Sequence, residues 1–150
     1  SICQPSRQPL DTQISIFVIA LARGLRKGEI KTPKAAMPPS GMLFSQGIRA
    51  GDYVLVTAGP FDLGGRLIRA DFKTCAKRTY ENIRAVLEAA GLSMANLVRT
   101  DNYLRDLEDV DEFNEVYAEC VPKPYPARGL CQPARLPLNM PVATVATAIA

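Results

Sequence analysis

The sequence predicts an α+β fold, a mixed β-sheet with two helices on one face, and three observations lead to that prediction. Short apolar and β-branched runs, separated by Gly and Pro, predict strands near both ends of the chain. Two longer segments repeat apolar residues three or four positions apart, as amphipathic helices do. The elements follow the order β-β-β-α-β-α-β-β, and right-handed crossovers then lay the helices on one face of the sheet.

Three strands are expected before the first helix. Residues 43–50 and 53–58 are strand-like runs joined by a short turn at Gly51 and Asp52, which together predict a β-hairpin. Gly64 and Gly65 support a second turn. The apolar residues 67–68 that follow it are expected to form a short third strand.

A long amphipathic helix is the next expected element. Asp71 is a residue type that caps helix N-termini, and Gly91 is the type that ends them. The positions between them that carry apolar or small side chains fall on one helical face: Phe72, Cys75, Ala76, Thr79, Tyr80, Ile83, Val86, Leu87 and Ala90.

The second half of the chain predicts four further elements: a strand at 96–104, a helix at 108–120, and strands at 127–134 and 142–150. The last strand is apolar on both faces, which is typical of a buried strand or of one covered by another subunit. Because both helices occupy one face, the other face of the sheet also needs a cover. The sequence therefore predicts an oligomer.

The composition excludes several function classes. A net charge of +3, spread along 150 residues, is too weak for a nucleic-acid footprint. The four cysteines have no CxxC spacing and the chain has no histidine, so we expect no metal and no cofactor. The thiols indicate a reducing, cytoplasmic location. Catalysis without histidine has to rely on arginine, carboxylates, backbone groups or bound water.

Residues 1–30 differ from the rest and are predicted to be an N-terminal extension of a single domain at 31–150. Their apolar run, residues 14–22, is too short to span a bilayer, so no membrane is expected as a partner. We expect this run to dock on the domain or on a neighbouring subunit, because an exposed run of Ile, Phe and Val would be adhesive. A signal peptide is the weaker alternative.

Several segments, taken in order, resemble the reactive intermediate deaminase family, also called Rid or YjgF-type and endoribonuclease L-PSP-like. The segment 44–48, Phe-Ser-Gln-Gly-Ile, resembles the family's Tyr-Ser-Gln-Ala-Ile. The matching segments continue through residues 56–59, 79–91, 103–107, 113–117, 126–128 and 134–137. Pro-Ala-Arg at 126–128 followed by Ala-Arg-Leu-Pro at 134–137 carries the most weight. The resemblance covers residues 31–150.

The resemblance implies a chorismate-mutase-like subunit in a homotrimer, with ligand clefts between subunits. Arg128 would hold the carboxylate of a 2-imino or 2-enamino acid, whose hydrolysis gives a 2-keto acid and ammonia. The other implied ligand-binding positions are Phe44, Gly59, Asn114, Gly129, Leu130 and Ala143. Arginine suits this role because its planar fork of donors matches a carboxylate. Ser45 and Gln46 are expected to be structural.

Four of these positions depart from the family pattern. Phe44 replaces the usual tyrosine, which keeps an aromatic wall and loses the hydroxyl. Ala143 stands where deaminases usually carry a glutamate that helps to hold the water. Leu130 replaces a usual cysteine, and Gly129 replaces a small hydroxyl residue. Loss of the acid could lower the rate about 10²-fold. A non-catalytic trimeric binder of small carboxylic acids with a regulatory role is therefore the alternative to an imine deaminase.

Overall fold

The computed structural model describes residues 20, 24 and 26–150 of the chain. The predicted docking of residues 14–22 lies outside the described residues, apart from residue 20. Among the residues that the structure describes, no helix is long and apolar enough to cross a bilayer.

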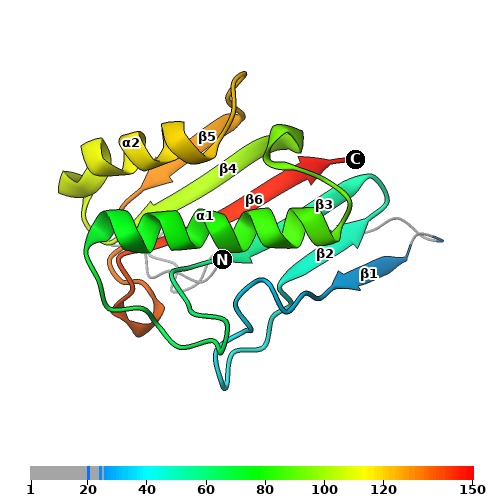
Figure 1. Cartoon of the computed structure of the whole chain (residues 1–150), viewed down its shortest axis with the longest axis horizontal. Coiled ribbons are helices and arrows are strands. Elements are labelled where there is room, and N and C mark those ends of the chain that lie inside the picture. Colours follow the sequence, from blue (N-terminus) through cyan, green and yellow to red (C-terminus); the bar gives the residue numbers. More distant parts are fainter. Residues whose placement is uncertain (1–19, 21–23, 25) are drawn as a thin grey trace, which may run out of the picture.

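A six-stranded mixed sheet forms one layer of the fold (Figure 1). Its strands, in the sheet order β1-β2-β3-β6-β4-β5, are antiparallel except for the parallel pair β4 and β5. Their bounds are Lys27–Ile30 for β1, Gly47–Ala50 for β2, Tyr53–Ala58 for β3, Leu97–Leu104 for β4, Ala127–Cys131 for β5 and Val142–Ile149 for β6. The predicted α+β class is confirmed.

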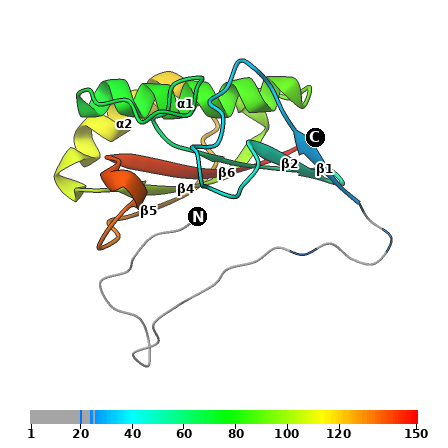
Figure 2. The same ribbon diagram turned by 90° about the horizontal axis from the view of Figure 1, so that it is seen from below.

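Two helices, α1 (Phe72–Ala89) and α2 (Val110–Cys120), cover one face of this sheet (Figure 2). The carboxylate of Asp71 accepts a hydrogen bond from the backbone N of Thr74 at 2.9 Å, as an N-cap does. Gly91 follows the C-terminal end of α1 with a φ of +75°, a left-handed conformation that favours glycine. Both ends of the predicted helix are therefore confirmed.

The first three strands are not the three that the sequence predicted. Residue Leu67 forms only an isolated bridge with Phe61, so the expected strand at 67–68 was wrong. The three strands before α1 are instead completed by β1, the first strand of the chain. It pairs with β2 and consists of the last residues of the predicted extension. Residues 43–46 precede β2 as a loop, where the Gln46 side chain bonds the backbone of Thr32 and Ala35.

Two other elements are shorter than expected. The strand predicted at 127–134 ends at Cys131, before Pro133, which has no N–H to donate to a sheet. The helix predicted at 108–120 begins at Val110, because residues 107–109 form a 3₁₀ turn that Asp106 caps.

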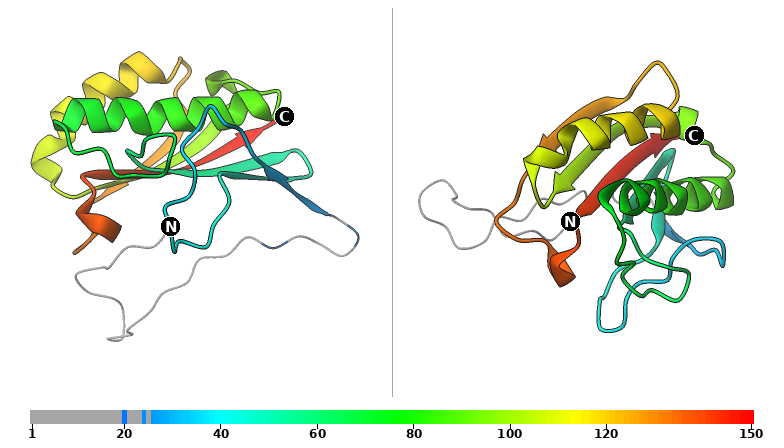
Figure 3. Two further views of the ribbon diagram at one scale, coloured as in Figure 1. Left: turned by 60° about the horizontal axis from the view of Figure 1, so that its bottom comes forward. Right: turned by 60° about the vertical axis from the view of Figure 1, so that its left-hand side comes forward.

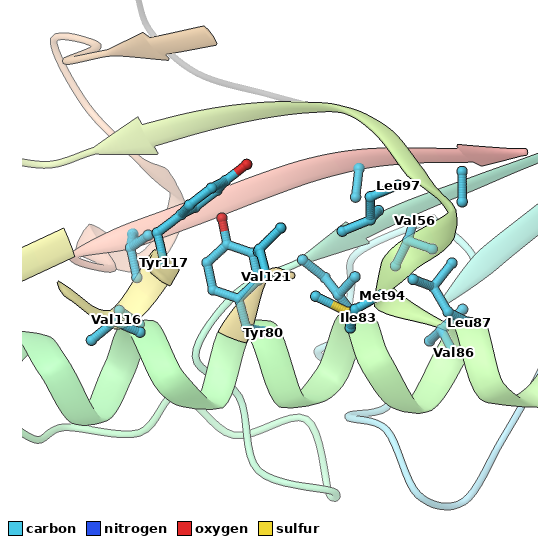
Figure 4. Close-up of a cluster of buried hydrophobic side chains, with 14 of the residues drawn as sticks. Val56, Tyr80, Ile83, Val86, Leu87, Met94, Leu97, Val116, Tyr117 and Val121 are labelled. Carbon is cyan, nitrogen blue, oxygen red and sulfur yellow. The ribbon is translucent and has the colours of Figure 1, made fainter. Parts of the chain in front are cut away.

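The hydrophobic core lies between the sheet and the helices (Figure 4). Its side chains come from the buried face of α1, from α2 and from alternate residues of the central strands. Those labelled in Figure 4 are Val56, Tyr80, Ile83, Val86, Leu87, Met94, Leu97, Val116, Tyr117 and Val121. Alternation puts Val142, Thr144, Ala146 and Ala148 of β6 on this buried side.

No described helix covers the opposite face of the sheet (Figures 2 and 3). Leu55, Val145 and Thr147 are partly buried there, whereas Tyr53 and Ile149 are exposed. This open face matches the prediction that two helices leave one sheet face without a cover.

We predict that Gly47→Ala destabilises the fold by about 1–3 kcal/mol, because overpacking a filled core costs that much. A Cβ at Gly47 would lie 2.5 Å from Cγ1 of Val86, which is buried in the core. Urea unfolding at a fixed protein concentration measures the effect. Gly28→Ala is the matched control, since a Cβ there meets no atom within 4 Å, and equal losses in the two variants would contradict the prediction.

Candidate functional site

Arg128 lies on β5, an edge strand that pairs only with β4 in the described sheet. The register sets Arg128 opposite Thr100, whose side chain is fully buried beneath the helices. Because paired residues share a face, Arg128 points toward the helical side, beside α2. Its side chain nevertheless remains exposed, since it extends past the edge of the sheet.

The guanidinium of Arg128 is held by neutral groups only. Its Nη1 donates to Oδ1 of Asn114 at 2.9 Å. Its Cζ lies 4.9 Å from the ring centroid of Tyr117 and 5.8 Å from that of Phe113, distances at which a cation is attracted to an aromatic ring. Among the residues that the structure describes, Arg128 forms no salt bridge.

The two residues after Arg128 face opposite sides of the sheet. Leu130 packs against the core on the helical side. Gly129 pairs with Asp101, and a Cβ at Gly129 would lie only 2.6 Å from Oδ1 of Asp101. That carboxylate also accepts two hydrogen bonds from Arg99, both at 2.9 Å. Gly129 is thus the residue that leaves room for the Asp101 carboxylate.

Phe44 and Gly59 line one pocket near the start of β2 and the end of β3, where Asn82 and Val86 of α1 also contribute to the wall. Phe44 is 41% exposed, so its ring forms an accessible wall. Gly59 packs tightly, because a Cβ there would lie 2.8 Å from the Phe61 ring and 3.0 Å from Sδ of Met140. A side chain at this position would have to displace the Phe61 ring and the end of Met140, so packing by itself favours glycine here.

Asn82 and Gln46 support the walls of this pocket rather than offering it free polar groups. Asn82 accepts from the backbone N of Ala36 at 2.9 Å and donates to the carbonyls of Gly59 and Phe61, both at 3.1 Å. The Gln46 amide bonds four backbone groups of residues 32–36. The expectation that Gln46 is structural agrees with these bonds.

Ala143 lies on the open face of β6 and packs against the small cluster of Phe61, Leu136 and Met140. This surrounding is apolar. Strands β3, β4, β5 and β6 contain a single carboxylate, Asp101. Strand β6, on which Ala143 takes the place of the family's usual glutamate, therefore carries no acid.

A single chain does not bring all the predicted site residues together. One group, Arg128 with Asn114, Gly129 and Leu130, lies at β5. The other, Phe44, Gly59 and Ala143, lies at or near the ends of β2, β3 and β6. Strands β6 and β4 separate β3 from β5, a distance of about 14 Å at about 4.8 Å per strand. One chain therefore keeps Arg128 away from Phe44 and Gly59, which agrees with the expectation of a cleft between subunits.

Sequence reasoning missed Tyr117 and Asn102. Tyr117 lies on the apolar face of α2, where an aromatic residue is typical of a core, yet its ring lies beneath the Arg128 guanidinium. Asn102 is fully buried in β4 and donates to the carbonyl of Gly129 at 3.1 Å. The spacing of three residues between Asn114 and Tyr117, which places both on one helical face, is a signal that could have found Tyr117.

A family model described as Endoribonuclease L-PSP matches residues 34–150 of the chain. The chain belongs to this family, the Rid or YjgF family. The resemblance noted from the sequence is thereby confirmed, and the match covers both groups of site residues.

Similar Rid proteins include a relative from a plant and two bacterial structures. Reactive Intermediate Deaminase A, chloroplastic, of Arabidopsis thaliana is 31% identical over 89% of this chain and 70% of its own length. The crystal structure of RidA from Psychrobacter sp. has a TM-score of 0.76 at 34% identity, covering 82% of this chain and 99% of that one. That of E. coli TdcF with bound serine has a TM-score of 0.72 at 29% identity, covering 82% and 98%.

We predict that Asn82→Ala destabilises the protein by about 2–4 kcal/mol, since each buried group left without a partner costs about 1–3 kcal/mol. The substitution leaves the partly buried N–H of Ala36 without its acceptor and removes a donor from each of two buried contacts with carbonyls. Urea unfolding tests it, with Asn114→Ala as a control that removes one exposed amide. Equal stability of Asn82→Ala and the wild type would disprove the structural role assigned to Asn82.

Proposed function

We propose that this Rid protein binds small 2-imino and 2-enamino acids through Arg128 and hydrolyses the imine. Water adds to the C=N carbon, the C–N bond breaks, and the products are a 2-keto acid and ammonia. The name of the Arabidopsis relative, a reactive intermediate deaminase, supports this reaction class. Serine, bound in the E. coli structure, is likewise a small acid with nitrogen at its second carbon.

The observation that carries the proposal is the unneutralised charge of Arg128. The guanidinium has five N–H groups, and within the described residues only Nη1 has a protein acceptor, the neutral amide of Asn114. Aromatic rings on one side restrict the side chain without neutralising it. A carboxylate would complete this arrangement with a charge-assisted pair of hydrogen bonds.

The cleft is completed, in this proposal, by a second copy of the chain in a homotrimer. Two observations support it. Gly59 follows β3 and Arg128 lies on β5, and these strands are three strand spacings apart in one chain, or about 14 Å. The sheet also has a face with the exposed apolar side chains of Tyr53 and Ile149, which no described helix covers. Subunit association would bury this face and join one chain's Arg128 to its neighbour's Phe44 and Gly59.

The main task of the protein in this reaction is to orient the substrate and the attacking water, because an imine carbon is already electrophilic. Arg128 would hold the substrate carboxylate, and backbone groups near Gly129 and Leu130 would contact the attacking water. The cytoplasmic location stays a prediction, since the Arabidopsis relative is named as a chloroplastic protein.

A second function, binding of small carboxylic acids without turnover, is favoured by the surroundings of Ala143. Its side chain packs among Phe61, Leu136 and Met140, and β6 carries no acid that could orient a water. Arg128 serves both functions equally. The two functions therefore differ in the rate of hydrolysis and agree in their requirement for the arginine.

Ammonia release from freshly generated 2-iminobutanoate is expected to be faster with the protein than in buffer. Arg128→Ala should lower the rate by about 10²-fold or to the buffer rate, the usual cost of removing a charged group that holds the reacting molecule. Arg66→Ala is the matched control, because Arg66 is an exposed arginine paired with Asp62.

The same proteins separate the two functions. If ammonia release stays at the buffer rate while 2-ketobutyrate raises the melting temperature of the wild type and not of Arg128→Ala, the protein is a binder. Absence of both effects would rule out Arg128 as a carboxylate site.

Light scattering after gel filtration should give three times the 16.3 kDa mass of the chain. The resemblance to the family implies the trimer, and the proposed cleft takes Arg128 and Phe44 from different copies. A monomer at micromolar concentration would remove the proposed site, since one chain does not assemble it.

A further inference from the structure

A chain of buried polar side chains runs through the core behind Arg128. It contains Tyr80 of α1, Thr100 and Asn102 of β4, Tyr117 of α2 and Thr144 of β6, all at most 4% exposed. Buried polar groups are costly unless each is hydrogen-bonded. Figure 4 shows the rings of Tyr80 and Tyr117 rising from the two helices with their hydroxyl groups directed toward the sheet.

Asn102 is the centre of this polar chain, and its amide uses all four of its hydrogen-bonding positions. Its Oδ1 accepts from the hydroxyl of Tyr80 at 2.8 Å and from that of Thr144 at 3.0 Å. Its Nδ2 donates to Oγ1 of Thr100 at 3.3 Å and to the carbonyl of Gly129 at 3.1 Å. Tyr80 of α1 and Thr144 of β6 therefore fix the amide oxygen of Asn102. The amide nitrogen in turn fixes Oγ1 of Thr100 and the carbonyl of Gly129.

Both groups that Asn102 fixes lie next to Arg128. The Gly129 carbonyl belongs to the residue that follows Arg128 on the edge strand. Oγ1 of Thr100 lies 3.1 Å from the hydroxyl of Tyr117, whose ring is 4.9 Å from Cζ of Arg128. Burial raises the pKa of Tyr80, which keeps its hydroxyl protonated and able to donate to Asn102 at physiological pH.

We propose that Asn102 is a positioning residue for Arg128: from the core it holds the backbone of β5 and, through Thr100, the aromatic ring on which the guanidinium lies. An edge strand with one neighbour has few bonds that fix its carbonyls, so a side-chain donor has a large effect there. This role rests on the proposed function only for its consequence, tight carboxylate binding. The positioning itself is a property of the protein without ligand.

Nuclear magnetic resonance relaxation of the Arg128 Nε–H bond tests the positioning directly. In the wild type its order parameter should exceed that of Arg66, whose side chain is 88% exposed and serves as an internal reference. In Asn102→Val it should fall toward the Arg66 value. Thr79→Val is the matched control, because it removes a fully buried hydroxyl that bonds only the Cys75 carbonyl within α1. An unchanged Arg128 order parameter in Asn102→Val overturns the proposal.

A second variant serves if Asn102→Val does not fold. The triple variant Tyr80→Phe, Asn102→Val, Thr144→Val removes the Asn102 acceptor together with both of its donors. Replacing hydrogen-bonded partners jointly by apolar groups of similar shape is nearly neutral for stability. It should show the same loss of order at Arg128, and a wild-type value in this folded variant overturns the proposal equally.

Calorimetric titration with 2-ketobutyrate then measures the consequence. Asn102→Val should weaken binding about three- to tenfold, the equivalent of losing about one hydrogen bond, and Thr79→Val should bind as the wild type does. If the wild type does not bind 2-ketobutyrate, the proposed function fails while the relaxation result still decides the positioning. If binding occurs and Arg128 keeps its order in Asn102→Val, the positioning role fails and the proposed function stands.

Discussion

Strand β5 joins the described sheet through a single neighbour, and its register against β4 decides which of its side chains reach the helical face. Opposite Thr100, Arg128 faces α2, where Asn114 and two aromatic rings receive it. A slip of one residue would turn Arg128 to the other face and bring Gly129 beneath the helix. The bonds from Asn102 and the fit between Gly129 and Asp101 both depend on this register.

The helices could be predicted from the sequence more accurately than the strands, because helical signals are local. Asp71 begins α1 by bonding a residue three positions along the chain, and Gly91 ends it through its own backbone conformation. Strand partners, in contrast, are chosen by packing across the whole fold. Residues 67–68 are apolar but form only one bridge, whereas the polar β1 pairs with β2 along its full length. No short-range pattern distinguishes these two segments.

The residues of the candidate site could be predicted from sequence motifs. The residues that hold Arg128 in place could not. Arg128 and Asn114 were named from the sequence, and the structure brings them within 2.9 Å. Tyr117 has the spacing of a core aromatic residue, and Asn102 is one polar residue in an alternating strand. Their roles follow from contacts between β4, β5 and α2, which sequence spacing does not reveal. The distance between the Arg128 group and Phe44 likewise depends on the order of strands in the sheet.

The close approach of Gly129 to the Asp101 carboxylate links two positions that lie on different strands. A Cβ at 129 would lie 2.6 Å from Oδ1 of Asp101, so a serine or threonine there, the residue type usual in the family, requires the Asp101 side chain to shift. Two hydrogen bonds from Arg99 hold the Asp101 carboxylate in its present place, so the residue at 129 is coupled to this ion pair. A hydroxyl residue introduced at 129 would therefore also disturb the Asp101–Arg99 pair, and exchanging residues 101 and 129 together avoids that effect.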